Sequence, residues 1–130
     1  MLLLAASLAL SPRLAQPARA AVPNDAAAQH ALDWLRSQQL PDGSFAATSP
    51  GFTADVSLAF ESAGVNPRTV RSATGADPIA FLTSAPGVVD NPGVAGKVVL
   101  VLTAANEAPE AAGQDLTVAI NQSYNAATGW

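Results

Sequence analysis

The chain lacks cysteine and has a single histidine among its 130 residues. Disulfide frameworks, thiol catalysis, iron–sulfur ligation and zinc fingers are therefore excluded. Charge is also scarce, since 12% of the residues are charged while 49% are hydrophobic, so the chain is too apolar for intrinsic disorder and should bury a core. The formal net charge of −4 argues against nucleic acid as a partner.

Long apolar runs are absent too. No stretch reaches the roughly 18 uninterrupted apolar residues of a transmembrane helix, so we expect no membrane span. A short apolar run at the start of the chain, residues 2–10, is followed by a small-x-small cleavage pattern at 18–20. We expect a signal peptide over residues 1–20, a mature domain over 21–130, and a secreted or extracytoplasmic protein. No basic residue precedes the run, and the alternative is a buried N-terminal helix, which Pro12 and Pro17 would interrupt.

Helix signals recur along the remaining chain. Asn24 can cap a first helix, and Asp77 and Asn91 each stand directly before a proline, an arrangement typical of a helix start. Apolar residues between these signals are spaced by three and four, which is the period of a helix. The pattern predicts an all-α chain with five helices, over about residues 24–39, 53–64, 78–84, 92–105 and from 115 almost to the end.

Two of these assignments depend on single features. We expect Thr53 to cap the second helix and Gly64 to end it, after a loop rich in turn residues at 41–44. The valine-rich stretch 98–102 leaves a strand as the alternative to the fourth helix, because β-branched residues favour strands.

An internal match is the strongest pattern in the sequence. Two segments agree at a constant offset of 42 residues, namely 58–67 and 100–109. Gly64 and Asn106 fall at equivalent places, and both residue types tolerate the left-handed backbone that follows a helix. A period of about 40 residues with two helices per unit predicts an array of helical hairpins in two layers, in which the second and fourth helices are equivalent.

The first hairpin carries a recognisable motif. An aromatic, an aliphatic, a glutamine, a glycine and an aromatic residue follow one another as Trp34, Leu35, Gln39, Gly43 and Phe45. This resembles the QW motif of the prenyltransferase and squalene-oxidase repeat in terpenoid-cyclase-like α/α toroids, with Phe45 where the family usually has tryptophan. The resemblance covers roughly residues 24–130 and implies part of a toroid. It gives Gln39 and Phe45 a structural role as a staple between hairpins.

Catalytic clusters known from that family have no clear counterpart. Squalene cyclases use a DxDD cluster, whereas only Glu107 and Glu110 lie comparably close here, in a loop where a solvated pair is expected. Protein prenyltransferases bind zinc with Asp, Cys and His, and His30 alone makes no such site. Arg68 and Arg71 fit either an anion clamp or a solvated pair. We therefore expect no catalytic, cofactor-binding or metal-binding residue and no cofactor.

Two further patterns have competing interpretations. Asn121 begins a glycosylation-type triplet, but it lies inside a predicted helix. The aromatic residues fit either a plain core or an apolar ligand cavity; they are Trp34, Phe45, Phe52, Phe60, Phe81, Tyr124 and Trp130.

Two functional hypotheses remain. The first is an exported, non-catalytic helical-repeat module for binding or scaffolding, with a small apolar ligand or a protein as its partner. The alternative is a fragment of an isoprenoid-acting enzyme, related to terpene cyclases or prenyltransferases. In either case five helices make fewer hairpins than a closed toroid, and an open array exposes apolar faces at its ends. We therefore also expect self-association.

Overall fold

A computed structural model describes residues 25–46 and 49–124. The regular structure in this part of the chain is mostly helical, with only one short two-stranded hairpin, which agrees with the predicted all-α class. The α-helices are α1 (Asp25–Ser37), α2 (Pro50–Ser62), α3 (Pro78–Ser84), α4 (Pro92–Ala104) and α5 (Leu116–Ser123). A 3₁₀ turn, η1 (Pro67–Thr69), and a small hairpin of β1 (Glu110–Ala111) and β2 (Gln114–Asp115) complete it. The expected signal peptide lies outside the described residues.

Side-chain caps fix where most helices begin. Asp77 accepts a hydrogen bond from the backbone N–H of Ala80 at the start of α3, and Asn91 and Asp115 cap α4 and α5 in the same way. These starts agree with the sequence-based assignment. The stretch 98–102 is helical, so the strand alternative is wrong, because its valines pack into the core from one face of α4.

One expected cap is wrong. Ser49, not Thr53, caps α2, which begins at Pro50 instead of three residues later. The N–H at the first helical position has no partner within the helix, so a proline, which lacks this N–H, fits there. Ser49-Pro50 is therefore a start of the same kind as Asn91-Pro92. Thr53 lies one turn inside the helix and is fully buried. The sequence did not suggest the β-hairpin of residues 110–115.

Helices α2 and α4 correspond residue by residue. Both have 13 residues and both begin with proline, 42 positions apart. Gly64 (φ +78°) and Asn106 (φ +61°) then adopt the same left-handed conformation. The next N–H in each case returns to the helix, at 2.9 Å from Val65 to the Phe60 carbonyl and 2.7 Å from Glu107 to the Leu102 carbonyl. The two helix ends are therefore the same capping motif.

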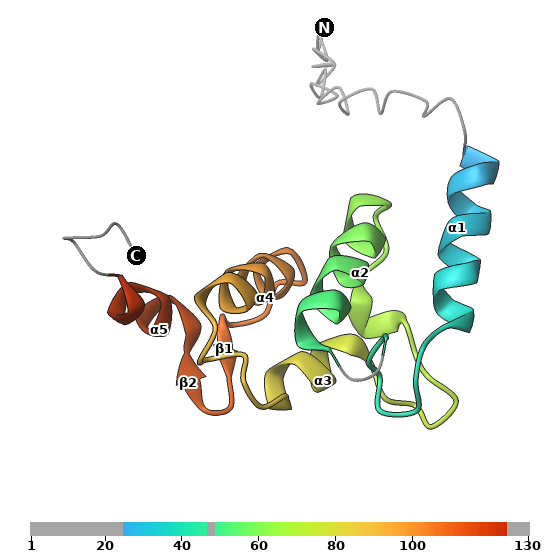
Figure 1. Ribbon diagram of the computed structural model, residues 1–130. Coiled ribbons are helices and arrows are strands. Elements are labelled where there is room, and N and C mark those ends of the chain that lie inside the picture. Colours follow the sequence, from blue (N-terminus) through green and yellow to red (C-terminus); the bar gives the residue numbers. More distant parts are fainter. Residues whose placement is uncertain (1–24, 47–48, 125–130) are drawn as a thin grey trace, which may run out of the picture.

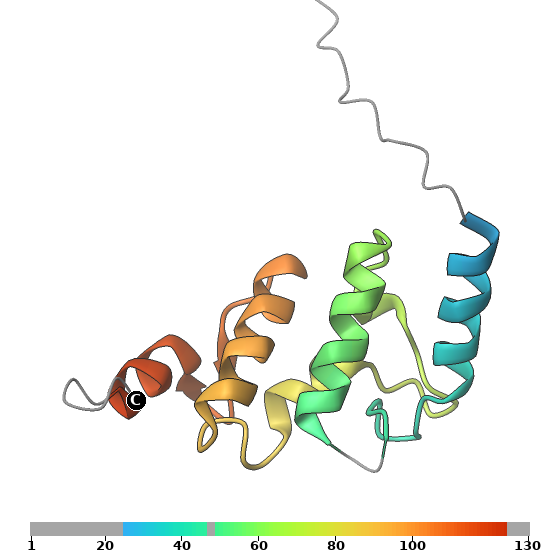
Figure 2. The ribbon, with the colours of Figure 1, turned by 45° about the horizontal axis from the view of Figure 1, so that its top comes forward.

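The helices are arranged as a row. In both views α2 and α4 lie side by side, with α1 beyond α2 at one end and α5 beyond α4 at the other (Figures 1 and 2). The short α3 lies near the lower ends of α2 and α4 and contacts both. Helix α2 therefore lies between two neighbours, with one side packed on α4 and the other turned to α1.

Two separate apolar clusters follow from this arrangement. The larger one joins one side of α2 to α3, α4 and α5, and includes Ile79, Leu82, Leu102 and Leu116, all fully buried. The smaller one joins the other side of α2 to α1, to the loop before α2 and to the end of η1; it contains Leu32, Phe45, Val56, Phe60 and Val70.

Candidate functional site

The loop between α1 and α2 is built on a tight turn at Gly43. Gly43 has φ +88°, and a Cβ there would lie 2.5 Å from the carbonyl oxygen of Asp77, so only glycine fits. Beside it, Asp42 accepts hydrogen bonds from the Ser44 hydroxyl at 2.6 Å and from its N–H at 3.0 Å. The hydroxyl contact is the main cause that lowers the pKa of Asp42. The turn is therefore rigid and rests directly on the start of α3.

Gln39 ties this loop to a distant segment. Its amide Nε2 donates to the carbonyl oxygens of Gly43 at 3.2 Å and Val70 at 3.3 Å, and Val70 ends the 3₁₀ turn η1. Its Oε1 is buried without a hydrogen-bond partner among the described residues. Gln39 thus joins the connection before α2 to the connection after it. Its assignment as a staple between toroid hairpins stays a prediction.

Phe45 is the buried anchor of the loop. It is 1% exposed, and its ring packs on Phe60 of α2 with 6.3 Å between ring centroids. Its N–H donates to the Thr53 hydroxyl oxygen at 3.0 Å. The Arg36 guanidinium also contacts Phe60, at 5.4 Å from the ring centroid, within the range of a cation–π contact. The loop is thereby held between α1 and α2.

A cavity of about 280 Å³ opens beside Phe45. Two exposed aromatic residues border it, Trp34 on α1 at 62% exposure and Phe52 on α2 at 48%. The complete lining is Trp34, Leu35, Gln38, Leu40, Phe45, Ala46 and Phe52. The cavity therefore brings together three of the five motif residues, Trp34, Leu35 and Phe45. The other two, Gln39 and Gly43, hold the loop that forms its wall.

The backbone at the cavity is strained at one point. Ala46, a lining residue, adopts φ +45°, which L-residues other than asparagine and aspartate rarely adopt. Such strain persists only where surrounding structure imposes it, and it is frequent at ligand sites. Sequence reasoning missed this feature because an alanine carries no signal of a left-handed conformation.

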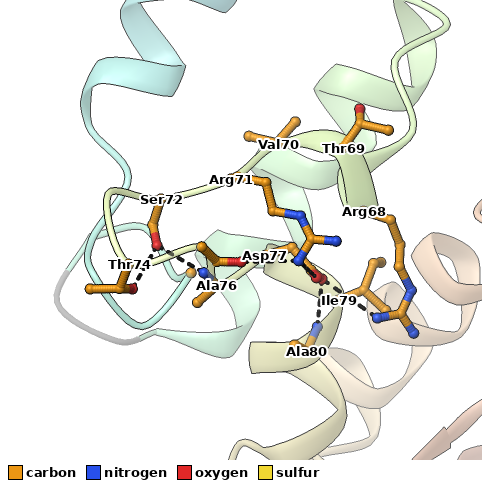
Figure 3. A network of polar contacts seen from close by, with 12 residues as sticks. Arg68, Thr69, Val70, Arg71, Ser72, Thr74, Ala76, Asp77, Ile79 and Ala80 are labelled. Atoms are coloured by element: carbon orange, nitrogen blue, oxygen red, sulfur yellow. Dashed lines mark hydrogen bonds and ion pairs between the residues drawn. The ribbon is translucent and has the colours of Figure 1, made fainter.

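A second polar cluster surrounds Asp77, as Figure 3 shows. The Asp77 carboxylate is 3% exposed and lies 2.8 Å from Arg71 and 3.7 Å from Arg68, while it also caps α3. Arg68 in addition contacts Glu107 at 2.6 Å. The two arginines do clamp an anion, but the anion is this internal carboxylate. The alternative of a solvated arginine pair is therefore wrong, because η1 and the short connection after it bring Arg68 and Arg71 to Asp77.

The expectation of a solvated pair of acids in the loop after α4 is wrong for Glu107. Glu107 is paired with Arg68, and that hydrogen bond lowers the pKa of its carboxyl group. Glu110 begins β1 and is exposed. His30 is exposed on α1, and Asn121 is exposed on α5. None of these side chains reaches the cavity lining.

Glu61 on α2 is the most perturbed acid. Both carboxylate oxygens are buried without a hydrogen-bond partner in the described part of the chain, and desolvation raises its pKa to about 7. Nothing in the sequence distinguished it, since the stretch around it reads as an ordinary amphipathic helix.

Within residues 25–46 and 49–124, no three His, Cys, Asp or Glu side chains lie close enough together to hold a metal ion. The described helices are also too short, or too polar, to cross a membrane. No family model, curated protein sequence or solved structure matches this chain.

Proposed function

We propose that this chain is an exported, non-catalytic helical module that binds a small apolar ligand in the cavity beside Trp34. The observation that carries the proposal is the pair of exposed aromatic rings, Trp34 and Phe52, at the border of a hollow whose lining includes the buried Phe45. Large apolar side chains are normally packed into the core, and a concave apolar surface edged by them is typical of a binding site.

The lining indicates the chemistry of the ligand. The amide of Gln38 and the indole N–H of Trp34 are the only polar side-chain groups among the lining residues. The volume of about 280 Å³ lies just below the usual range of ligand pockets, which starts at about 300 Å³, so the ligand must be small. A hydrocarbon or aromatic group with one polar end therefore fits best.

We also propose that the helices belong to a hairpin array of the α/α toroid type. The support is the equivalence of α2 and α4 in length, start and capping motif at a shift of 42 residues. In such an array each hairpin covers the apolar face of its neighbour. The cavity would then lie within the first hairpin, between α1, α2 and the loop that joins them.

Tryptophan fluorescence tests the ligand site directly. Trp130→Phe leaves Trp34 as the single tryptophan of the chain. Geraniol and n-decanol, two alcohols of equal carbon number, serve as apolar probes. We expect either probe to shift the Trp34 emission to shorter wavelength with saturation, because the ligand replaces water beside an indole that is 62% exposed.

Phe52→Ala should weaken this binding several-fold, since an aromatic contact contributes about 0.5–1.5 kcal/mol beyond the area it buries. Leu100→Ala is the matched control, because Leu100 is also a large exposed apolar residue on a helix but lies on α4, outside the lining. An emission that never changes up to the solubility limit of both probes, or equal effects of the two substitutions, would rule out the cavity as the site.

A further inference from the structure

The equivalence of α2 and α4 identifies a face of α4 that no other described helix covers. On α2, the stripe of Gly51, Ala54, Leu58 and Glu61 lies on the side that receives α4. A Cβ added to Gly51 would lie 3.5 Å from the Val94 side chain, and Ala54 is fully buried in the cluster that contains α4. This stripe is therefore an occupied helix-binding surface.

Residues 42 positions later occupy the same stripe on α4. They are Gly93, Gly96, Leu100 and Thr103, which we call the outer face of α4. Leu100 is 59% exposed, whereas its equivalent Leu58 packs against the larger cluster. A Cβ added to Gly96 would meet nothing within 4 Å, and Thr103 is exposed. The outer face of α4 is thus the counterpart of a filled surface, without an occupant among the described residues.

The α2–α4 contact shows what fits such a stripe. The side of α4 turned to α2 presents Val94, Val98 and Val101, and the latter two are fully buried. Valines are short enough to let the two backbones approach over Gly51 and Ala54. The helices run side by side in the same direction, since two contacts advance together along both. Gly51 lies opposite Val94, and Asp55 forms an ion pair at 2.8 Å with Lys97, its own equivalent on α4.

We propose that the outer face of α4 binds an α-helix of a partner protein that runs parallel to α4 and presents valine-type residues at i, i+4 and i+7. The glycines at positions 93 and 96 allow a close approach, and Leu100 supplies the apolar contact. Lys97 borders this face as Asp55 borders the equivalent face of α2, but its ammonium is already paired with Asp55 at 2.8 Å, so close approach and apolar contact carry the recognition.

A peptide of residues 90–107 is a suitable probe, because it carries the valine stripe that α2 already accepts. In the peptide, Gly96→Lys and Leu100→Glu are joined as a lactam on the side away from the valines, which holds a short chain in helical form. Lys97→Glu in the peptide avoids a like charge opposite Lys97 of the protein. Circular dichroism establishes its helicity before use.

Binding of the labelled peptide to the whole chain is measured by fluorescence anisotropy. We expect saturable binding, at least tenfold weaker for Leu100→Arg in the protein. We expect less than a twofold change for Val118→Arg, a matched exposed position at 49% on α5. A peptide that also carries Val98→Asp should not bind. Both protein variants should keep the parent melting curve, since both side chains are exposed.

Three results would overturn the proposal. One is the absence of binding by the helical peptide, and another is an equal loss for Leu100→Arg and Val118→Arg. The third comes from sedimentation of the chain alone: a dimer that Leu100→Arg dissociates would assign the outer face of α4 to a second copy of this chain instead of a partner helix.

Discussion

The two sides of α2 differ in how firmly they are packed. Toward α3, α4 and α5 the helix joins a cluster of twelve buried residues, whereas toward α1 the cluster has five. Residues 26–31 of α1 are all exposed, and the helix makes only sparse contacts with other elements. The difference shows that most of the stability of the row comes from its C-terminal part, while α1 is attached through Leu32, Leu35 and the loop that follows it.

Polar contacts compensate in part for the smaller cluster. The loop between α1 and α2 is fixed by Gln39, by the turn at Gly43 and by the hydroxyl of Thr53. Serine and threonine side chains at 72 and 74 also donate to the Pro41 carbonyl oxygen. The candidate ligand cavity therefore lies in the less stable region, which is where local opening and ligand-linked motion are expected.

The largest loss in the free energy of unfolding should come from a substitution in the larger cluster. Leu102→Ala removes a fully buried side chain of α4 and should lower the free energy of unfolding by about 2–5 kcal/mol. Leu32→Ala in the smaller cluster should cost less, because the loss is limited to the free energy that holds α1 on α2. Urea unfolding measures both.

Hydrogen exchange sharpens this comparison. In Leu32→Ala the amides of α1 should exchange faster while those of α4 keep their protection, because α1 opens locally. In Leu102→Ala protection should fall throughout. Equal losses in the two variants, with α1 and α4 losing protection together, would show that the two clusters unfold as one unit.

A smaller effect is expected at Asp77, which links the regions. Asp77→Ala removes the cap of α3 and should cost about 0.5–2 kcal/mol. The lost ion pairs should add little, since the Arg68 and Arg71 side chains are 39% and 55% exposed. Asp77→Asn keeps a capping oxygen and should recover most of the loss in thermal unfolding. If Asn is as damaging as Ala, the charge on Asp77 matters more than its capping bond.

The sequence predicted the helices of the larger cluster well, for a physical reason. The starts of α3, α4 and α5 are each determined by a neighbouring side chain that caps its own helix, and such local interactions can be read from a few residues. The start of α2 was misjudged because Ser49 and Thr53 are both capping residue types, and only burial of Thr53 decides between them.

The site was predictable only in part. The motif identified Trp34, Leu35 and Phe45, which do line one cavity. Asp77 was expected only as a helix cap, yet it also binds two arginines and lies against the turn at Gly43. The cavity wall at Ala46 and the buried carboxylate of Glu61 also depend on contacts between segments distant in sequence, which spacing does not encode.

Glu61 makes the packed side of α2 sensitive to pH. Its pKa of about 7 in the folded chain exceeds the ordinary value of 4.5, so the folded state holds its proton more tightly than the unfolded state. The stabilising contribution of Glu61 is therefore complete below about pH 4.5 and is lost as the pH rises through about 7.

Glu61→Gln should remove this dependence. The variant and the parent should melt at similar temperatures near pH 4, and the variant should melt at a higher temperature near pH 8, since the substituted amide carries no charge to bury. Thermal melts across this range measure the difference. If the two melting curves differ by the same amount at every pH, the buried carboxylate does not titrate as its environment indicates.

The smallest effect is expected at the ion pair that joins the equivalent positions of α2 and α4. Asp55 and Lys97 are about half exposed, at 51% and 44%, so water and salt screen their attraction. Lys97→Met should change the free energy of unfolding by less than about 1 kcal/mol, and less still in high salt. The exchanged pair Asp55→Lys with Lys97→Asp should match the parent, because the parallel arrangement places the two positions opposite each other in either order. If the exchange destabilises the chain well beyond Lys97→Met, the two positions are not interchangeable and the equivalence of α2 and α4 does not extend to their side chains.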